Sequence, residues 1–237
     1  PAFRFFCKMT FYKLLLFTVS IGVIILSIPR GRNAENIVFL RTLVLPLKYI
    51  FGIQIVVKGK ENLRTKKPFV LVVNHQTSLD IMVMMAILPN RCVPIAKKEI
   101  LYMGTFGLAC WLSGVVFIDR QRREESISIL TELAHSLHRD NLRVLIFPEG
   151  TRNHGGSMLP FKRGAFQLAL KAQVPIIPVV LSSYSSFYNQ KEKRFTPGKM
   201  IIQILPEVKT LGLGPDNVPK LMEQVRDSML TTYQEIS

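Results

Sequence analysis

His75 and Asp80 are the residues whose types and spacing point most directly to proton transfer. They lie in the segment NHQTSLD, which follows the apolar run FVLVV at residues 69–73. An imidazole takes a proton from a hydroxyl group when a carboxylate bonded to its other ring nitrogen fixes its tautomer. A turn can bring the two side chains together. The segment therefore predicts a general base, His75, oriented by Asp80, although a strand-end histidine that bonds only to the backbone fits the same spacing.

Spacing alone does not identify such a pair, because His135 and Asp140 are separated by the same number of residues. Residues 124–139, however, carry apolar side chains at helical intervals, namely Ile127, Leu130, Leu133, Ala134 and Leu137. This periodicity predicts an amphipathic helix. His135 and His138 fall outside its apolar stripe, so we expect them to face solvent.

Two further segments place charged side chains at the ends of apolar runs. RVLIF at residues 143–147 leads into PEGTR, and VVFI at residues 115–118 leads into Asp119 and Arg120. Glycine N–H groups, the Thr151 hydroxyl and the Arg152 guanidinium can bind one phosphate together. The alternatives are a solvated turn for PEGTR and a surface position for Arg120.

The elements that must position these residues alternate between strands and helices. Apolar runs predict strands at residues 69–73, 92–96, 115–118, 143–147, 174–179 and 200–205. Periodic segments predict one helix that begins near residue 78, a second at 124–139, a third that ends at residue 171 and a fourth at 219–236. We expect an α/β fold with a mixed, largely parallel central sheet flanked by helices. In such sheets ligands bind at the carboxyl ends of the strands.

Residues 101–118 contain no charged side chain and are long enough to be mistaken for a membrane span. If they crossed a bilayer, His75 and the later motifs would lie on opposite sides of it. We therefore expect a short helix followed by the strand at 115–118. Residues 174–179 (VPIIPV) read as a buried strand with proline at its entry and exit, and residues 191–199 as a basic loop.

Composition restricts the class of protein. The chain has 237 residues, enough for one α/β catalytic domain, and a net charge of +15, which favours anionic partners. No nucleic-acid module is recognisable, so an anionic membrane surface or a phosphorylated substrate is the stronger interpretation. The cysteines are scattered and odd in number, which predicts a reduced, cytosol-facing domain without structural zinc.

The N-terminal region has the character of a membrane anchor. Residues 14–28 are uncharged and strongly apolar, so we expect a helix that spans the membrane or lies deep within it. Residues 37–57 are also apolar, but Arg41, Pro46 and Lys48 interrupt them. This pattern predicts an interfacial amphipathic segment, with an ordinary core-packing helix as the alternative. The chain would then divide into an anchor at residues 1–57 and a catalytic domain at 58–237.

Four segments occur together in a recognisable order, namely NHQTSLD, VVFIDR, FPEGTR and VPIIPV. In order and spacing they resemble the four motif blocks of the glycerophospholipid acyltransferases, in particular the branch that acylates 1-acylglycerol 3-phosphate. The resemblance extends from about Arg30 to the last residue. The residues that match the central motif positions are His75, Asp80, Arg120, Glu149, Gly150, Thr151 and Arg152.

The resemblance implies acyl transfer from acyl-CoA to the sn-2 hydroxyl of 1-acylglycerol 3-phosphate, giving phosphatidic acid and CoA. His75 and Asp80 would act as the base without a covalent acyl-enzyme, and neither a metal nor a cofactor would take part, since acyl-CoA is a substrate. Arg152 and Arg120, together with Lys97, would hold the acceptor's phosphate. Glu149 would orient a cation or the acceptor's glycerol, and VPIIPV would contribute to binding the acceptor or the acyl donor.

The resemblance also implies partners and a location. The partners would be acyl-CoA, lysophosphatidic acid and a bilayer with anionic headgroups, not nucleic acid. The location would be the endoplasmic reticulum membrane, with the catalytic domain on the cytosolic side. Alternatives are the same chemistry on glycerol 3-phosphate or another lysophospholipid, a hydrolase in which His75 activates water, and a non-catalytic membrane-binding protein. The acyltransferase interpretation requires His75 and Arg152 to converge on one lipid headgroup.

Overall fold

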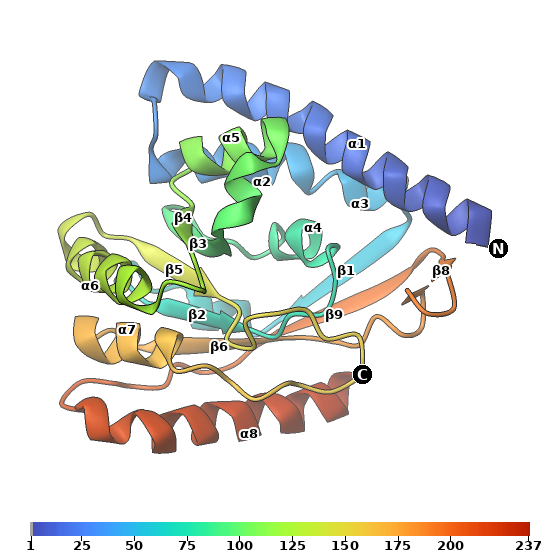
Figure 1. Cartoon of the computed structure of the whole chain (residues 1–237). Coiled ribbons are helices and arrows are strands. Elements are labelled where there is room, and N and C mark those ends of the chain that lie inside the picture. The colour runs from blue at the N-terminus through green and yellow to red at the C-terminus, as the bar shows by residue number, and fades with distance from the viewer. Residues whose placement is uncertain (1) are drawn as a thin grey trace.

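A seven-stranded sheet forms the centre of the molecule in the computed structural model, which describes residues 2–237 (Figure 1). Its strand order is β1-β9-β6-β2-β5-β3-β4. The strands are β1 (Ile53–Lys58), β2 (Val70–Val73), β3 (Cys92–Lys97), β4 (Val116–Ile118), β5 (Arg143–Ile146), β6 (Ile176–Leu181) and β9 (Gly198–Ile204). Only β6 and β9 pair antiparallel within this sheet. The expected α/β fold with a mixed, largely parallel sheet is confirmed.

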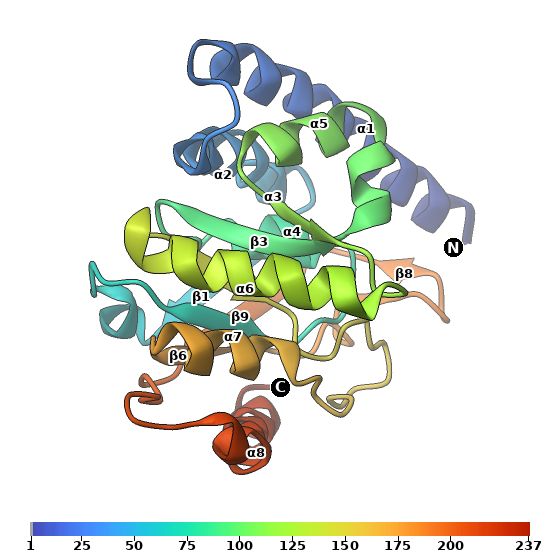
Figure 2. The same ribbon diagram turned by 60° about the vertical axis from the view of Figure 1, so that its left-hand side comes forward.

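Helices cover both faces of the sheet, and Figures 1 and 2 show the two helical layers. One layer contains α1 (Ala2–Ser27), α2 (Ile37–Val44), α3 (Leu47–Ile50), α4 (Asp80–Met84) and α5 (Gly104–Leu112). The other contains α6 (Arg123–Arg139), α7 (Gly164–Ala172) and α8 (Val218–Ile236). Short 3-10 turns lie at Ile28–Arg30, Ala34–Asn36, Lys60–Leu63, Lys98–Tyr102 and Pro215–Asn217, and a small hairpin joins β7 (Tyr188–Asn189) to β8 (Arg194–Phe195).

The central strand β2 is buried on both faces, which explains its unbroken apolar sequence. Leu71 and Val73 pack into the core beneath α1–α4, whereas Val70 and Val72 pack into the core against α6–α8. Alternate residues of one strand thus contribute to two separate cores. β2 therefore holds the segment that follows it, beginning at Asn74, in a fixed position.

The N-terminal helix α1 lies along the domain and packs against α2 and α5. Its buried face includes Phe5, Tyr12 and Leu16, while Phe3 on the outer face is 79% exposed. In the part of the chain that the structure describes, Ala2–Arg30 is the one helical stretch long and apolar enough to cross a membrane. This apolar helix favours membrane association. It is longer than residues 14–28, the stretch from which the sequence predicted it.

The expectation for residues 37–57 is wrong at its C-terminal end. Residues Ile53–Lys58 form strand β1, which pairs in parallel with β9 and crosses the division expected between residues 57 and 58. The rest of the segment forms α2 and α3, and Ile37, Leu40 and Val44 are buried in the first core. For α2 the alternative of a core-packing helix is therefore correct.

Most other sequence-based elements are confirmed, with two corrections near the C-terminal half of the sheet. Residues 101–118 form α5 followed by β4, and His135 and His138 are exposed on α6. Pro178 lies inside β6 and not at its exit, because the strand continues to Leu181. The expected basic loop at 191–199 contains β8 and the start of β9.

Candidate active site

The candidate residues lie where several parallel strands end at the same edge of the sheet. His75 follows β2 and Glu149 follows β5, and these strands are neighbours. Lys97 ends β3, and Arg120 comes two residues after the end of β4. Lys97 is paired with Ile118 in the β3–β4 ladder, which brings it close to the start of the Arg120 segment. The topology therefore brings all three motif segments to one edge, where parallel α/β sheets bind ligands.

His75 and Asp80 form the predicted pair. Nδ1 of His75 lies 2.7 Å from Oδ2 of Asp80, whose side chain is fully buried, whereas the His75 side chain is 18% exposed. The same Oδ2 accepts the backbone N–H groups of Gln76 at 2.7 Å and Thr77 at 3.1 Å. A carboxylate at Nδ1 favours the tautomer that carries its proton there. Nε2 is then the nitrogen that can accept a proton from a substrate.

The residues beside His75 fasten the turn to a neighbouring strand. The Asn74 side chain donates to the Leu181 carbonyl at 3.0 Å and accepts the Leu181 N–H at 2.7 Å. Gln76 donates to the Ser182 carbonyl at 2.9 Å. Sequence reasoning assigned no role to Asn74 or Gln76, and only their position on either side of His75 could have suggested one.

On the other side of the turn, the His75 ring stacks on Phe147. The ring centroids are 4.0 Å apart and the planes are inclined by 20°. Phe147 comes immediately after β5 and begins the segment FPEGTR. Packing against this ring limits the rotation of the imidazole, so β5 positions His75 as well as Glu149.

Glu149 is a second buried carboxylate, only 3% exposed. Oε1 accepts the His75 backbone N–H at 2.8 Å, and Oε2 accepts the Leu159 N–H at 2.9 Å. Burial raises the pKa of the Glu149 carboxyl group, and the two backbone hydrogen bonds partly oppose that shift. Both oxygens thus bind the protein backbone. Contact with a cation or with glycerol, the role expected from the sequence, stays a prediction.

The FPEGTR loop is joined to the His75 turn by its backbone. Gly150 has φ +72°, a conformation that glycine adopts most readily, and its N–H donates to the Phe147 carbonyl at 3.1 Å. Nη1 of Arg120 donates to the Gly150 carbonyl. The Asn153 N–H donates to the His75 carbonyl at 2.9 Å. Arg120 and Gly150 therefore share a contact that fixes the loop beside the imidazole.

Thr151 and Arg152 are exposed at the tip of this loop, and Lys97 is exposed at the end of β3. Desolvation by partial burial lowers the pKa of His154, the positive charge of Arg152 lowers it further, and the negative charge of Asp80 opposes the shift. Arg152 and Asp80, the partner of His75, thus act electrostatically on the same neighbouring side chain. The convergence of His75 and Arg152 on a single headgroup stays a prediction.

Residues 2–237 contain no group of three or more histidine, cysteine, aspartate or glutamate side chains that could hold a metal ion. His75 and Asp80 pair with each other, and Cys92 and Cys110 are buried. The expectation that neither a metal nor a cofactor takes part stays a prediction.

Comparison with known proteins assigns the family. A family model described as Acyltransferase matches residues 54–182. Human 1-acyl-sn-glycerol-3-phosphate acyltransferase alpha is 52% identical over 237 residues, which cover 100% of this chain and 84% of that protein. The human beta enzyme is 44% identical over 238 residues, covering 100% and 86% respectively. The matched range contains His75, Asp80, Arg120 and the FPEGTR loop.

A solved structure has the same fold. The 1-acyl-sn-glycerophosphate (LPA) acyltransferase PlsC from Thermotoga maritima superposes with a TM-score of 0.71 at 24% identity. The match covers 100% of this chain and 98% of the bacterial chain. The N-terminal helices and the sheet are therefore parts of one shared architecture.

Glu149→Gln tests whether the buried carboxylate holds the His75 backbone. In either orientation the amide directs its NH2 group at one of the two backbone N–H donors, so one hydrogen bond is lost. A hydrogen bond to a charged group contributes about 1.5–3 kcal/mol, so we expect about a 10- to 100-fold loss of exchange protection at His75 or Leu159. Hydrogen–deuterium exchange of peptides from the detergent-solubilised protein measures it.

The exposed Glu207 provides the matched control, and Glu207→Gln should leave both amides protected as in the wild type. The free energy of unfolding is not a suitable readout. Replacing a buried charge, whose burial is unfavourable, by a neutral amide offsets part of the stability that is lost with the hydrogen bond. Unchanged protection of both amides in Glu149→Gln would show that the carboxylate does not hold the turn.

Proposed function

Because the chain belongs to the Acyltransferase family, we propose that it transfers an acyl group from acyl-CoA to the sn-2 hydroxyl of 1-acylglycerol 3-phosphate, forming phosphatidic acid and CoA. Relatives that carry the name 1-acyl-sn-glycerol-3-phosphate acyltransferase support this acceptor. The observation that carries the chemistry is the 2.7 Å bond between His75 and Asp80, at the sheet edge that also bears the FPEGTR loop. The base and the anion-binding loop are then joined directly by their backbones.

In this reaction His75 transfers the proton and the substrate hydroxyl is the nucleophile. Nε2 removes the hydroxyl proton as the oxygen forms a bond to the thioester carbonyl carbon, while Asp80 stabilises the imidazolium through Nδ1. The carbon–sulfur bond breaks as the tetrahedral intermediate collapses, and the imidazolium returns the proton to the CoA sulfur. No protein nucleophile is required, so no acyl-enzyme forms.

The positive side chains around the loop bind the acceptor's phosphate. Arg152 is exposed at the tip and is free to form a bidentate contact. Arg120 donates through Nη1 to the Gly150 carbonyl and keeps further N–H donors for the phosphate. Lys97 adds a third positive charge at the end of β3, which suits a doubly charged phosphate monoester. Glu149 acts on the backbone at a distance from the phosphate, which avoids the repulsion between two anions.

The N-terminal helix brings the site to its lipid substrates. The outer face of α1 exposes Phe3, Leu14 and Ile25, the 3-10 turn after it exposes Ile28, and burying such side chains in a bilayer is favourable. We place this face in the membrane, with the positively charged protein surface against anionic headgroups. The proposed location is the endoplasmic reticulum, with the catalytic domain in the cytosol. Lysophosphatidic acid then reaches His75 from the bilayer and acyl-CoA from the aqueous side.

The acceptor is tested with the purified full chain and acyl-CoA, using 1-acylglycerol 3-phosphate, glycerol 3-phosphate and a lysophosphatidylcholine in parallel. We expect phosphatidic acid, identified by its mass, as the dominant product because only the first acceptor combines a phosphate monoester with an sn-2 hydroxyl on a lipid. Preferred acylation of another acceptor would contradict the substrate assignment. Free fatty acid formed without any acceptor would indicate a hydrolase.

His75→Ala tests the base. General acid–base catalysis contributes typically 100- to 10,000-fold, and we expect kcat to fall by about this factor with the KM values nearly unchanged. His135→Ala on the exposed face of α6 is the control and should retain wild-type turnover. A folded His75→Ala protein with kcat within a few-fold of wild type would rule out the mechanism and favour a non-catalytic role.

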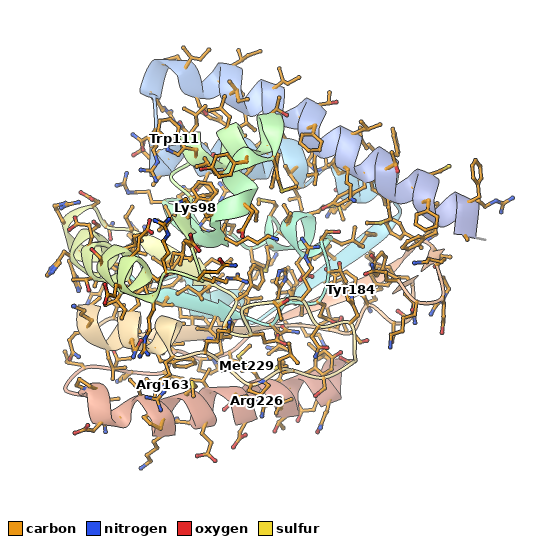
Figure 3. All side chains as sticks on the ribbon, in the orientation of Figure 1. Lys98, Trp111, Arg163, Tyr184, Arg226 and Met229 are labelled. Carbon is orange, nitrogen blue, oxygen red and sulfur yellow. The ribbon has the colours of Figure 1, made fainter. Side chains whose placement is uncertain are left out.

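Arg152→Glu tests the phosphate contact. Reversing this charge should raise the KM for the acceptor about 10- to 100-fold, the equivalent of one charge-assisted hydrogen bond, and leave the KM for acyl-CoA within about twofold. Arg163→Glu at the start of α7 is the control for a change of net charge on an exposed arginine (Figure 3). Equal increases in both KM values would show that Arg152 does not distinguish the acceptor from the donor.

A further inference from the structure

Two buried oxygens at the catalytic turn have no hydrogen-bond partner among the described residues. They are Oδ1 of Asp80 and the hydroxyl of Tyr184. A buried polar atom without a partner is unfavourable, and buried carboxylate oxygens are normally hydrogen-bonded. His75 and two backbone N–H groups occupy only Oδ2 of Asp80. The other oxygen of this anion therefore needs a donor from elsewhere in the fold.

The topology brings Tyr184 to this position. Tyr184 comes three residues after the end of β6, which lies beside β2 in parallel with Val179 opposite Val73. Gln76 binds the Ser182 carbonyl at 2.9 Å, so the chain leaving β6 passes along the catalytic turn.

Tyr184 is held firmly by its own segment. Its carbonyl accepts the N–H groups of Phe187 at 3.0 Å and Tyr188 at 2.8 Å. Its ring packs against Phe187 with 5.4 Å between the centroids, and the residue is 3% exposed. A side chain fixed in this way can hold a hydroxyl at a constant position next to a carboxylate.

The electrostatic surroundings favour a neutral phenol that donates its proton. Burial raises the pKa of Tyr184 well above its ordinary value, and the negative charge of Asp80 raises it further. The phenol therefore keeps its proton at physiological pH. Other titratable groups that interact with His75 or Asp80 come from the loops, α1 and β7, namely Glu149, His154, Tyr12 and Tyr188, with the charge of Arg152 beside them.

We propose that Tyr184 is a positioning residue whose hydroxyl donates to Oδ1 of Asp80, so that Tyr184, Asp80 and His75 form one hydrogen-bonded chain. The proposal rests on the proposed function, because it assumes that His75 is the base. The tyrosine stabilises the ionised carboxylate and holds its plane toward Nδ1 of His75. It touches neither substrate, and it lies outside the four motif segments.

Removing the Tyr184 hydroxyl should shift the pH dependence of activity in one direction. Without the hydroxyl, the negative charge of Asp80 is less well stabilised and holds the imidazolium proton more strongly. His75 then remains protonated, and inactive as a base, up to a higher pH. The acidic limb of the pH–rate profile should move upward, and activity lost at neutral pH should partly return at alkaline pH.

Tyr184→Phe is the test, because it removes the hydroxyl and keeps the ring. At pH 7 we expect kcat to fall about tenfold, the acidic limb to rise by about half a unit to one unit, and both KM values to stay within about twofold. Tyr233→Phe is the matched control. Its hydroxyl is also buried without a partner, but it lies on α8 in the second core, and both kcat and the pH profile should remain those of the wild type.

A folded Tyr184→Phe protein with the wild-type pH profile overturns the proposal, and so does an equal shift in Tyr233→Phe. An NMR titration of the His75 ring in wild type and Tyr184→Phe decides the question without substrate, and equal midpoints overturn it. If the wild type transfers no acyl group, the proposed function fails while this titration still tests the hydrogen-bonded chain. If Tyr184→Phe does not fold, an experimental wild-type structure with the two oxygens more than about 3.5 Å apart overturns the proposal.

Discussion

The rest of the site depends on the burial of one carboxylate. Asp80 is fully buried, and an ion removed from water in this way persists only when hydrogen bonds replace its hydration. His75 and the backbone of Gln76 and Thr77 supply these bonds to one oxygen. They can do so because β2 ends at Val73 and α4 begins at Asp80. The same few residues therefore fold the turn and fix the tautomer of the imidazole.

Two buried carboxylates, Asp80 and Glu149, bind different parts of His75. Asp80 binds the His75 ring, whereas Glu149 binds the His75 backbone and extends the contact to Leu159. Two anions so close to one residue repel each other, and Asp80 is one of the causes that raise the pKa of Glu149. Glu149 offsets this by accepting two backbone N–H groups. His75 is thereby held at both its main chain and its side chain, and Nε2 remains the ring nitrogen that can accept a proton.

Features determined by neighbouring residues were predictable from the sequence, and those determined by distant partners were not. The His75–Asp80 pair spans five positions, and strand and helix periodicities are local, so both were predicted correctly. Strand β1 was missed because its partner β9 lies far along the chain and because charged residues before it resembled an interfacial helix. The hydrogen bond between Glu149 and His75 joins residues 74 positions apart. Its donor is a backbone N–H, which every residue except proline has, so the residue types could not reveal it.

The N-terminal helix links the turn that carries His75 to the exposed apolar face of the molecule. Tyr12 of α1 is fully buried and donates its hydroxyl to the Ser78 carbonyl at 3.0 Å, inside the turn that carries His75. Phe5 and Leu16 on the same face join the core between the sheet and helices α1–α4, while the opposite face is apolar and exposed. An anchor on a flexible linker would leave the base at a variable height above a bilayer. In the proposed membrane placement, a helix packed into the core fixes that height, and the fold itself sets how far a headgroup must rise to reach the imidazole.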